Sequence, residues 1–449
     1  MTLVANRPEA GPARPYEFPE IRRVSVAGGT VVAAHLPGQL LASSMLMLDA
    51  GAAHEADGRE GTATVLAKSL EEGTTSRDSA AYALALEGLG AELSASVDWD
   101  SFRVGVSAPV PLLLDAVRLA AEATRTPRLD DADVTRVRDD EVTALRMDWA
   151  QPGPRADAAL RADLFAGPEP RYARPLHGDP ASVAAVTVDD VHAFHREWLL
   201  RPGVLLVAGD LDTLDLTALG EAAFAGAQGE PLPVEGPLGV PVRDHRRTIL
   251  VDRPGSVQST LRIGHRAPER ATPDYVPMTL AATVLGGAFT SRLNHLIREV
   301  KGYTYGIRGS YAMTRRFGRF EVAAGVQTAV TVPAIADTIG EIARTQLDGV
   351  TEDELAVARS WRAGQLSVEM QTPGAIVGAL STLVLHGLPD DYYPSLRRQY
   401  LESTVEQVSA AAARYLHPKG LTLVVEGDAA AIRDELTAAE IGELVDAEL

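Results

Sequence analysis

An internal duplication constrains this chain more than any other feature. In the first half, Thr187 opens a helical pattern, and a run of aliphatic residues then ends in a Gly-Asp turn at Asp210. In the second half, Thr404 opens the same kind of pattern, and a second aliphatic run ends in a Gly-Asp turn at Asp428. The offset is 217 residues from Thr187 to Thr404 and 218 from Asp210 to Asp428. A near-constant offset favours duplication over chance, so one architecture is built twice.

Both aliphatic runs are continuous, which is typical of strands covered on both faces, and each helix begins with a Thr N-cap. Further strands are expected at residues 22–27, 30–36, 40–50, 92–97 and 102–107, and at 248–252, 257–265, 303–313 and 317–324. Long helices are expected at 111–124, 131–149, 330–347 and 352–370. Strands followed by helices in each half predict an α+β fold of two homologous domains, each a mostly antiparallel sheet covered by helices.

A segment rich in Pro and Gly separates the two halves. It holds Pro231, Pro233, Pro237 and Pro241, which are spaced so that neither a helix nor a central strand can form. The predicted division is a flexible N-terminal segment at residues 1–19, a first domain at 20–225, a linker at 226–243 and a second domain at 244–449.

Charge and composition exclude several classes of protein. The net charge of −19 argues against nucleic acid and anionic membrane surfaces, because both attract clustered Lys and Arg. The absence of Cys excludes disulfides, thiolate metal sites and thiol nucleophiles. Residues 1–19 lack the apolar core of a signal peptide, and no apolar run approaches the ~18 residues of a membrane span. We therefore expect a cytoplasmic protein.

The first helix of the first half has the frame of a metal motif. Residues 61–74 read G-T-A-T-V-L-A-K-S-L-E-E-G-T, which resembles the zinc helix of the pitrilysin/insulinase-like peptidases, roughly G-L-A-H-F-L-E-H-M-L-F-K-G-T. In that family, two His of an inverted H-x-x-E-H motif ligate zinc and the Glu is the general base. Here the His positions hold Thr64 and Lys68, and the Glu position holds Ala67. No metal is therefore expected on this chain.

The third zinc ligand of that family is a Glu about 76 residues beyond the second His. Counting from Lys68 leads to Ala144, and residues 145–147 match the apolar-Arg-Met segment of the family. Glu141 lies one helical turn earlier but is expected to have no His partners. The resemblance therefore implies that all three ligands and the base are missing.

The second half keeps another signature. Residues 285–305 resemble the family pattern S-R-L-x-x-x-[LI]-R-E-x-x-G-x-x-Y. In the family, its Arg and the Tyr seven residues later hold the peptide and stabilise the oxyanion at the zinc site of an opposing domain. By position these residues are Arg298, which is expected to close a helix, and Tyr305, which is expected to start the next strand after a turn at Gly302. A guanidinium fork and a phenol hydroxyl suit both tasks.

Other candidate residues are assigned structural roles. Turn or surface positions are expected for His54, Glu55, Asp57, His192 and His195, packing or turn hydrogen bonds for Arg292 and Asn294, and a plain loop for Gly286 and Gly287. The spacing of His192 and His195 can bind a metal, but the duplicated helix has Ser409 and Ala412 at those places.

The resemblance implies that this chain forms half of a clam-shell chamber. It would be the zinc-less, substrate-binding subunit of a heterodimeric zinc metallopeptidase, similar to alpha-type subunits of mitochondrial processing peptidase, and inactive alone. Zinc would lie on a homologous partner that carries H-x-x-E-H, and the substrate would be a small or leader peptide. The alternatives are an inactive scaffold, a peptide-binding homodimer on the same fold, and an active peptidase with an unrecognised metal site.

Overall fold

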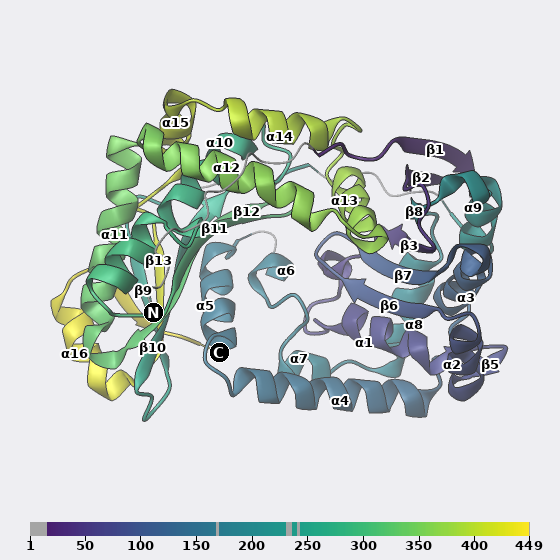
Figure 1. Cartoon of the computed structure of the whole chain (residues 1–449). Helices are drawn as coiled ribbons and strands as arrows, with labels where there is room; N and C mark the ends of the chain where they lie inside the picture. Colours follow the sequence, from purple (N-terminus) through teal and green to yellow (C-terminus); the bar gives the residue numbers. More distant parts are fainter. Residues whose placement is uncertain (1–15, 168–169, 230–235, 240–242, 449) are drawn as a thin grey trace, which may run out of the picture.

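The computed structural model describes residues 16–167, 170–229, 236–239 and 243–448. Most of the predicted N-terminal segment and half of the predicted linker, including Pro231, Pro233 and Pro241, lie outside these residues. The chain folds into two six-stranded sheets on opposite sides of the molecule, with helices around and between them (Figure 1). A further sheet of two short strands pairs β4 (Gly73–Thr74) with β5 (Arg77–Asp78).

The two sheets have the same order of inner strands. The first sheet runs in the spatial order β1 (Ile21–Val26), β2 (Gly29–His35), β8 (Val204–Gly209), β3 (Leu41–Leu48), β7 (Phe102–Pro109) and β6 (Glu92–Val97). The second runs in the order β14 (Glu443–Asp446), β9 (Arg247–Asp252), β13 (Thr422–Gly427), β10 (Gln258–Ala267), β12 (Gly318–Gln327) and β11 (Ile307–Met313). Only the outermost strand differs, because β1 pairs antiparallel with β2 whereas β14 pairs parallel with β9. The remaining pairs are antiparallel except β2 with β8 and β9 with β13. The predicted α+β fold of two duplicated domains is therefore confirmed.

Helices follow the strands in each half. The first half contains α1 (Thr62–Ser69), α2 (Ser79–Gly88), α3 (Leu113–Arg125), α4 (Asp131–Trp149), α5 (Pro154–Leu164), α6 (Pro170–Ala173), α7 (Pro180–Ala184), α8 (Val188–Phe194) and α9 (Leu216–Phe224). The second contains α10 (Tyr275–Ala282), α11 (Thr331–Asp348), α12 (Glu352–Glu369), α13 (Pro373–Leu385), α14 (Tyr392–Glu402), α15 (Val405–Tyr415) and α16 (Ala429–Ala438). Short π-helical segments lie at His195–Leu199, Thr283–Gly287 and Asn294–Val300.

The duplicated helices begin with the same hydrogen bonds. Thr187 Oγ1 accepts from the backbone N–H of Asp190 at 3.2 Å, and the Asp190 carboxylate accepts from the N–H of Thr187 at 2.8 Å. Thr404 and Gln407 repeat this capping box at 3.3 and 2.9 Å. Each box satisfies N–H groups that the first helical turn leaves unpaired, which confirms the Thr N-caps expected from the sequence.

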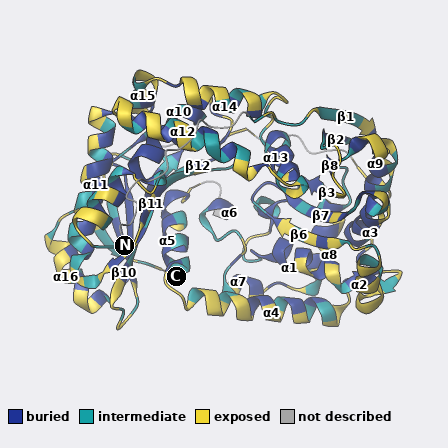
Figure 2. Cartoon of the chain, in the orientation of Figure 1, coloured by how far each residue is buried: buried dark blue, intermediate teal, exposed yellow. Residues whose placement is uncertain are grey.

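Each sheet is covered on its inner face by a helix from the other half of the chain. Helix α13 packs against β2, β3 and β8, and α5 packs against β9, β10 and β13. Along β8, Leu205 and Val207 join the core of their own domain, whereas Leu206 and Ala208 join the core that contains α13. Figure 2 shows buried residues along both sheets and along the helix faces that are turned towards them. Burial on two faces explains why both central strands are continuous aliphatic runs.

The turn between β11 and β12 ties the second domain to the first. The ring of Phe317 is 3% exposed and packs against Trp99, Phe165 and Tyr172 of the first domain, with ring centroids 6.0, 4.6 and 4.8 Å away. The neighbouring Arg315 donates to the Asp49 carboxylate at 2.8 Å and to the carbonyl of Leu385 at 3.0 Å. An aromatic anchor and an ion pair therefore hold this turn in place.

No single helix within the described residues is long and apolar enough to cross a membrane. Helices α12 and α13 meet that test only when taken together, across a bend of 118°.

Removal of the aromatic anchor is predicted to destabilise the fold. Phe317→Ala opens a cavity between the domains and is expected to lower the free energy of unfolding by about 3–5 kcal/mol in urea titrations. Leu347, which is 81% exposed, provides the matched control, and Leu347→Ala is expected to stay within about 0.5 kcal/mol of the wild type. Equal losses in the two variants would contradict the anchor.

A buried carboxylate beside the same turn gives a pH prediction. Burial raises the pKa of Asp100 to about 6, although Arg315 opposes the shift by donating its backbone N–H at 3.2 Å. Because an acid with a raised folded-state pKa is destabilising once ionised, the contribution of Asp100 to stability falls as the pH rises from about 4 to 6. Asp100→Asn retains an acceptor oxygen and is predicted to exceed the wild type in unfolding free energy by on the order of 2 kcal/mol at pH 7.5.

The gain from Asp100→Asn is expected to shrink towards zero at about pH 4, when urea unfolding is measured at both pH values. Asp115→Asn, at an exposed position on α3, is the control and is expected to stay within about 0.5 kcal/mol of the wild type. A gain in unfolding free energy for Asp100→Asn that is the same at both pH values would refute the raised pKa of Asp100.

Candidate functional site

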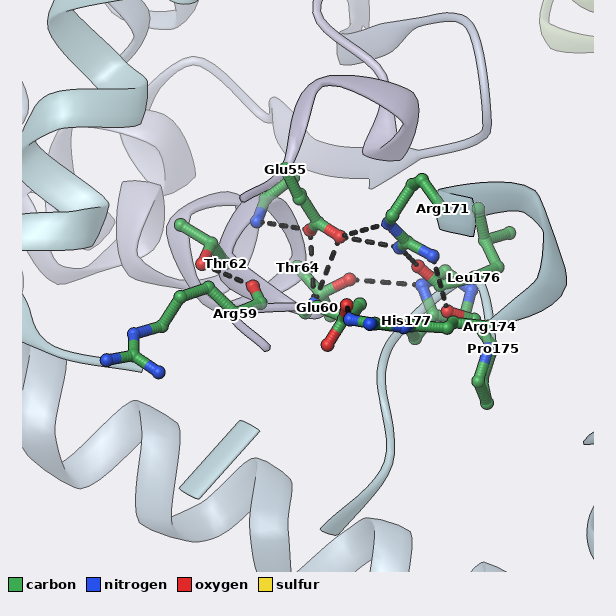
Figure 3. Close-up of polar contacts among 12 residues, drawn as sticks. Glu55, Arg59, Glu60, Thr62, Thr64, Arg171, Arg174, Pro175, Leu176 and His177 are labelled. Atoms are coloured by element: carbon green, nitrogen blue, oxygen red, sulfur yellow. Dashed lines mark hydrogen bonds and ion pairs between the residues drawn. The ribbon is translucent and has the colours of Figure 1, made fainter. Parts of the chain in front are cut away.

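A buried carboxylate fixes the start of α1. Glu55 accepts from the N–H groups of Gly61 at 3.1 Å and of Ala63 at 2.9 Å, and its other oxygen pairs with Arg171 at 2.5 Å (Figure 3). Gly61 has φ 100°, a left-handed conformation that glycine adopts without strain. A negative charge at a helix N-terminus is stabilised by the unpaired N–H groups there, so Glu55 sets the direction of α1.

The two His positions of the motif are occupied by other contacts. Thr64 is 8% exposed, and its Oγ1 lies 3.0 Å from Nδ1 of His177 (Figure 3). Lys68 forms an ion pair with the carboxylate of Glu141, which is 6% exposed on α4. His177 is accessible to solvent, but partial desolvation lowers its pKa, so the neutral imidazole prevails at pH 7. The structure thus brings together α1, α4 and the segment after α6.

The donor set at this place does not fit zinc. A hydroxyl at Thr64, a methyl group at Ala67 and an ammonium at Lys68 replace two imidazoles and a carboxylate. The ammonium carries the positive charge that a metal would bring and already neutralises Glu141. Zinc requires three or four N, O or S donors, and of the described residues around α1 only His177 and Glu141 remain.

The carboxylate that faces α1 is not at the predicted register. Counting along the sequence pointed to Ala144, but Ala144 is exposed, and the residue in contact with Lys68 is Glu141. The two positions differ by three residues on one helix. Glu141 was also expected to have no His partner, but its charge acts on His177. Desolvation lowers the pKa of His177 overall, and the negative charge of Glu141 opposes part of that shift.

Sequence reasoning missed Glu55, Arg171 and His177. Glu55 was expected in a polar turn and is instead a buried helix cap. His177 lies 113 residues from Thr64, and no fixed spacing connects two such positions. One signal was available, because Arg171, Arg174 and His177 stand three residues apart in a short polar segment.

Arg298 and Tyr305 lie in the second domain. Among the described residues, no hydrogen bond or ion pair joins either of them to Thr64, Lys68, Glu141 or His177. Arg298 is in the last turn of the π-helical segment Asn294–Val300. Tyr305 is 97% exposed and lies in the loop before β11, so the expectation that it starts the strand was wrong. Gly302 supplies the predicted turn with φ 66°. No hydrogen bond between the described residues involves the hydroxyl group of Tyr305.

Arg292 and Asn294 have the structural roles that were expected of them. Arg292 donates two bonds of 2.7 Å to the Glu354 carboxylate and thereby lowers the pKa of Glu354 to about 2. The buried amide of Asn294 donates to the carbonyls of Ala288 at 3.2 Å and of Ile307 at 2.8 Å. Asn294 therefore joins the segments before and after Arg298.

One group in the described residues could hold a metal ion by geometry, namely His35, Asp210 and Asp212. Its hydrogen bonds recur in the second domain. The N–H of Leu211 donates to His35, and the N–H of Ala429 donates likewise to Asp252. The N–H groups of Gly38 and Gly255 donate to Asp210 and Asp428, respectively. The duplicated copy has Ala430 in place of Asp212, so these residues close a turn in both domains.

Two other histidines are explained by packing. His195 was expected at the surface but is buried, and its Nε2 lies 2.9 Å from the carbonyl oxygen of Thr124. The ring of His54 stacks on Trp198 with centroids 4.0 Å apart. Neither belongs to a group of potential metal ligands in the described part of the chain.

Comparisons with known proteins agree with this architecture. Residues 30–169 match the family model described as insulinase (peptidase family M16), and residues 185–360 match the model described as peptidase M16 inactive domain. The two matches together cover more than half of the chain. The fold and the motif frame thus define a two-domain protein of the pitrilysin/insulinase-like class. The chain belongs to this M16 peptidase family, as a member whose zinc-motif positions hold no metal ligand.

Relatives and solved structures extend over nearly the whole chain. An uncharacterized zinc protease of Mycobacterium tuberculosis is 27% identical over 420 residues, covering 91% of this chain and 94% of that protein. An uncharacterized zinc protease of Streptomyces coelicolor is 25% identical over 381 residues, covering 80% and 79%. A peptidase M16 inactive domain from Pseudomonas fluorescens superposes with a TM-score of 0.84 at 25% identity, covering 91% of this chain and 98% of that one. A protease from Helicobacter pylori shares the fold, with a TM-score of 0.77 at 17% identity and coverage of 92% and 100%.

The register of the lost site can be tested by restoring the ligands. Thr64→His with Lys68→His is predicted to create a zinc site completed by Glu141, detected as uptake of about one zinc per chain. Adding Glu141→Gln is expected to weaken zinc binding at least about tenfold in isothermal titration. Loss of a group that only hydrogen-bonds to a zinc ligand already lowers metal affinity by that factor, and Glu141 would bind the metal directly. Ala144→Gln in the same background is the matched control and is expected to have no effect. Equal losses from both changes would contradict the role of Glu141.

Proposed function

We propose that this chain is the zinc-less, substrate-binding subunit of a heterodimeric metallopeptidase. It would not cleave peptides alone, and a homologous partner that carries H-x-x-E-H would supply zinc. The observation that carries the proposal is the pairing of Lys68 with Glu141, which fills the metal position with a side chain of the same charge sign. Membership of a peptidase family supports the reaction class, and the partner follows because the chain lacks the groups that activate water.

The contribution of this chain to the shared site would come from Arg298 and Tyr305. Arg298 offers in-plane N–H donors to a peptide carbonyl or carboxylate, and Tyr305 offers a hydroxyl that no group of the described chain occupies. Donors aimed at an oxygen that becomes negative during attack stabilise it most in the transition state. The substrate class is therefore an extended peptide, held between the two subunits in a closed chamber. A cytoplasmic location stays a prediction from the sequence.

The direct test uses the chain together with its partner. The partner is sought as a neighbouring reading frame that encodes H-x-x-E-H, and the pair is purified together and assayed with fluorogenic peptides. Arg298→Ala and Tyr305→Phe are each predicted to lower kcat by about 10²–10³, the range for loss of one oxyanion donor. Arg308→Ala, on the exposed side of β11, is the matched control and is expected to leave kcat unchanged.

Two results would overturn the proposal. The first is stoichiometric zinc and peptide cleavage by this chain alone. The second is unchanged turnover by the pair in both variants, which would favour an inactive scaffold or a peptide-binding homodimer on the same fold.

A further inference from the structure

An exposed aromatic ring lies against Arg298. Phe289 is 69% exposed, and the guanidinium carbon of Arg298 is 3.8 Å from the centre of its ring. A cation within ~6 Å of a ring centre is attracted by the negative face of the ring. The Arg298 side chain is 21% exposed, whereas the Phe289 ring against it remains largely in water.

A carboxylate holds the same guanidinium at one edge. Nη2 of Arg298 donates to Oε1 of Glu299 at 3.1 Å, and the second oxygen of Glu299 lies 3.1 Å from Nδ1 of His295. Glu299 is therefore shared between Arg298 and His295. A guanidinium has five N–H donors in one plane, and stacking leaves all of them available. Only one is engaged with a carboxylate in the described structure, so the remaining donors can bind another group.

The backbone that carries Phe289 is tied down on both sides. The N–H of Ala288 donates to the carbonyl of Thr283 at 3.1 Å, and the N–H of Ser291 donates to the carbonyl of Ala288 at 3.1 Å. The amide of Asn294 donates to that same Ala288 carbonyl. The ring is therefore presented by a hydrogen-bonded turn that is coupled to the helical segment of Arg298.

We propose that Phe289 is a positioning residue for Arg298, an inference that rests on the proposed function. The ring restricts the long Arg side chain to one plane and leaves its free N–H edge directed at an acceptor. The ligand class for that edge is a carbonyl or carboxylate of an extended peptide, because a planar donor fork matches both groups. Fixing the side chain before the peptide binds lowers the entropy lost on binding.

The first test uses the isolated chain and phenylglyoxal, a reagent that modifies arginine. The rate at Arg298 is measured by peptide mass spectrometry in the wild type, Phe289→Leu and Phe289→Tyr. Leu keeps the apolar bulk without the π face, so the rate is expected to rise about threefold or more, whereas Tyr keeps the wild-type rate. Arg308 is the internal control, with one rate in all three proteins. An equal modification rate at Arg298 in Phe289→Leu and Phe289→Tyr would refute stacking of the Phe289 ring on the Arg298 guanidinium.

The second test measures peptide cleavage by the chain paired with its zinc-bearing partner. Phe289→Leu is expected to lower kcat/KM about three- to tenfold, and Phe289→Tyr to restore it. In the Arg298→Ala background, Phe289→Leu is expected to have no further effect, which a merely structural role would not produce. A fall in Arg298→Ala with no change in Phe289→Leu refutes the positioning role alone. No change in Arg298→Ala and Tyr305→Phe together refutes the proposed function, whereas the phenylglyoxal rates still show whether Phe289 stacks on Arg298.

Discussion

The structure depends on a mutual exchange in which each half contributes one helix to the sheet of the other half. Helix α13 closes the inner face of the first sheet and α5 closes that of the second, so neither sheet could bury its aliphatic face alone. Polar contacts follow the same route: Asp163 of α5 is buried, accepts from the Thr422 hydroxyl at 2.6 Å, and pairs with Arg243 and Arg247. The two domains are therefore halves of one folding unit, and this fixes α1 relative to the π-helical segment that carries Arg298.

Much of the fold could be predicted because the signals are local. The N-caps at Thr187 and Thr404 and the aliphatic strands that follow them need only neighbours in the sequence. The start of β11 could not be predicted in this way. Thr304 donates its hydroxyl to the carbonyl of Gly325 at 2.7 Å and accepts from the N–H of Gly306 at 3.1 Å. Such side-chain bonds compete with a sheet ladder, so the strand begins at Ile307. The helix exchange depends on contacts between distant segments, and the sequence has no spacing that encodes them.

The candidate site divides in the same way. The loss of zinc ligands could be predicted from residue identity alone. Thr64 and Lys68 cannot replace two His as zinc ligands, and Ala67 cannot act as a general base. What replaced the ligands could not be predicted. A count along the chain reached Ala144 because it assumes fixed connection lengths, whereas packing of α4 on α1 selects Glu141. Arg298 and Tyr305 were found by motif, but the ring of Phe289 beside Arg298 becomes visible only in three dimensions.

The two sheets take their outermost strands from opposite ends of the chain. Within the described residues, β1 is the first element and β14 the last, and each pairs with one hydrogen-bonding edge of an aliphatic neighbour. The family match begins at residue 30, after β1. A fragment trimmed to that boundary would bare the row of N–H and C=O groups along β2. Unpaired edges can pair with other extended chains, so the loss of β1 would expose the aliphatic strand β2 to such pairing.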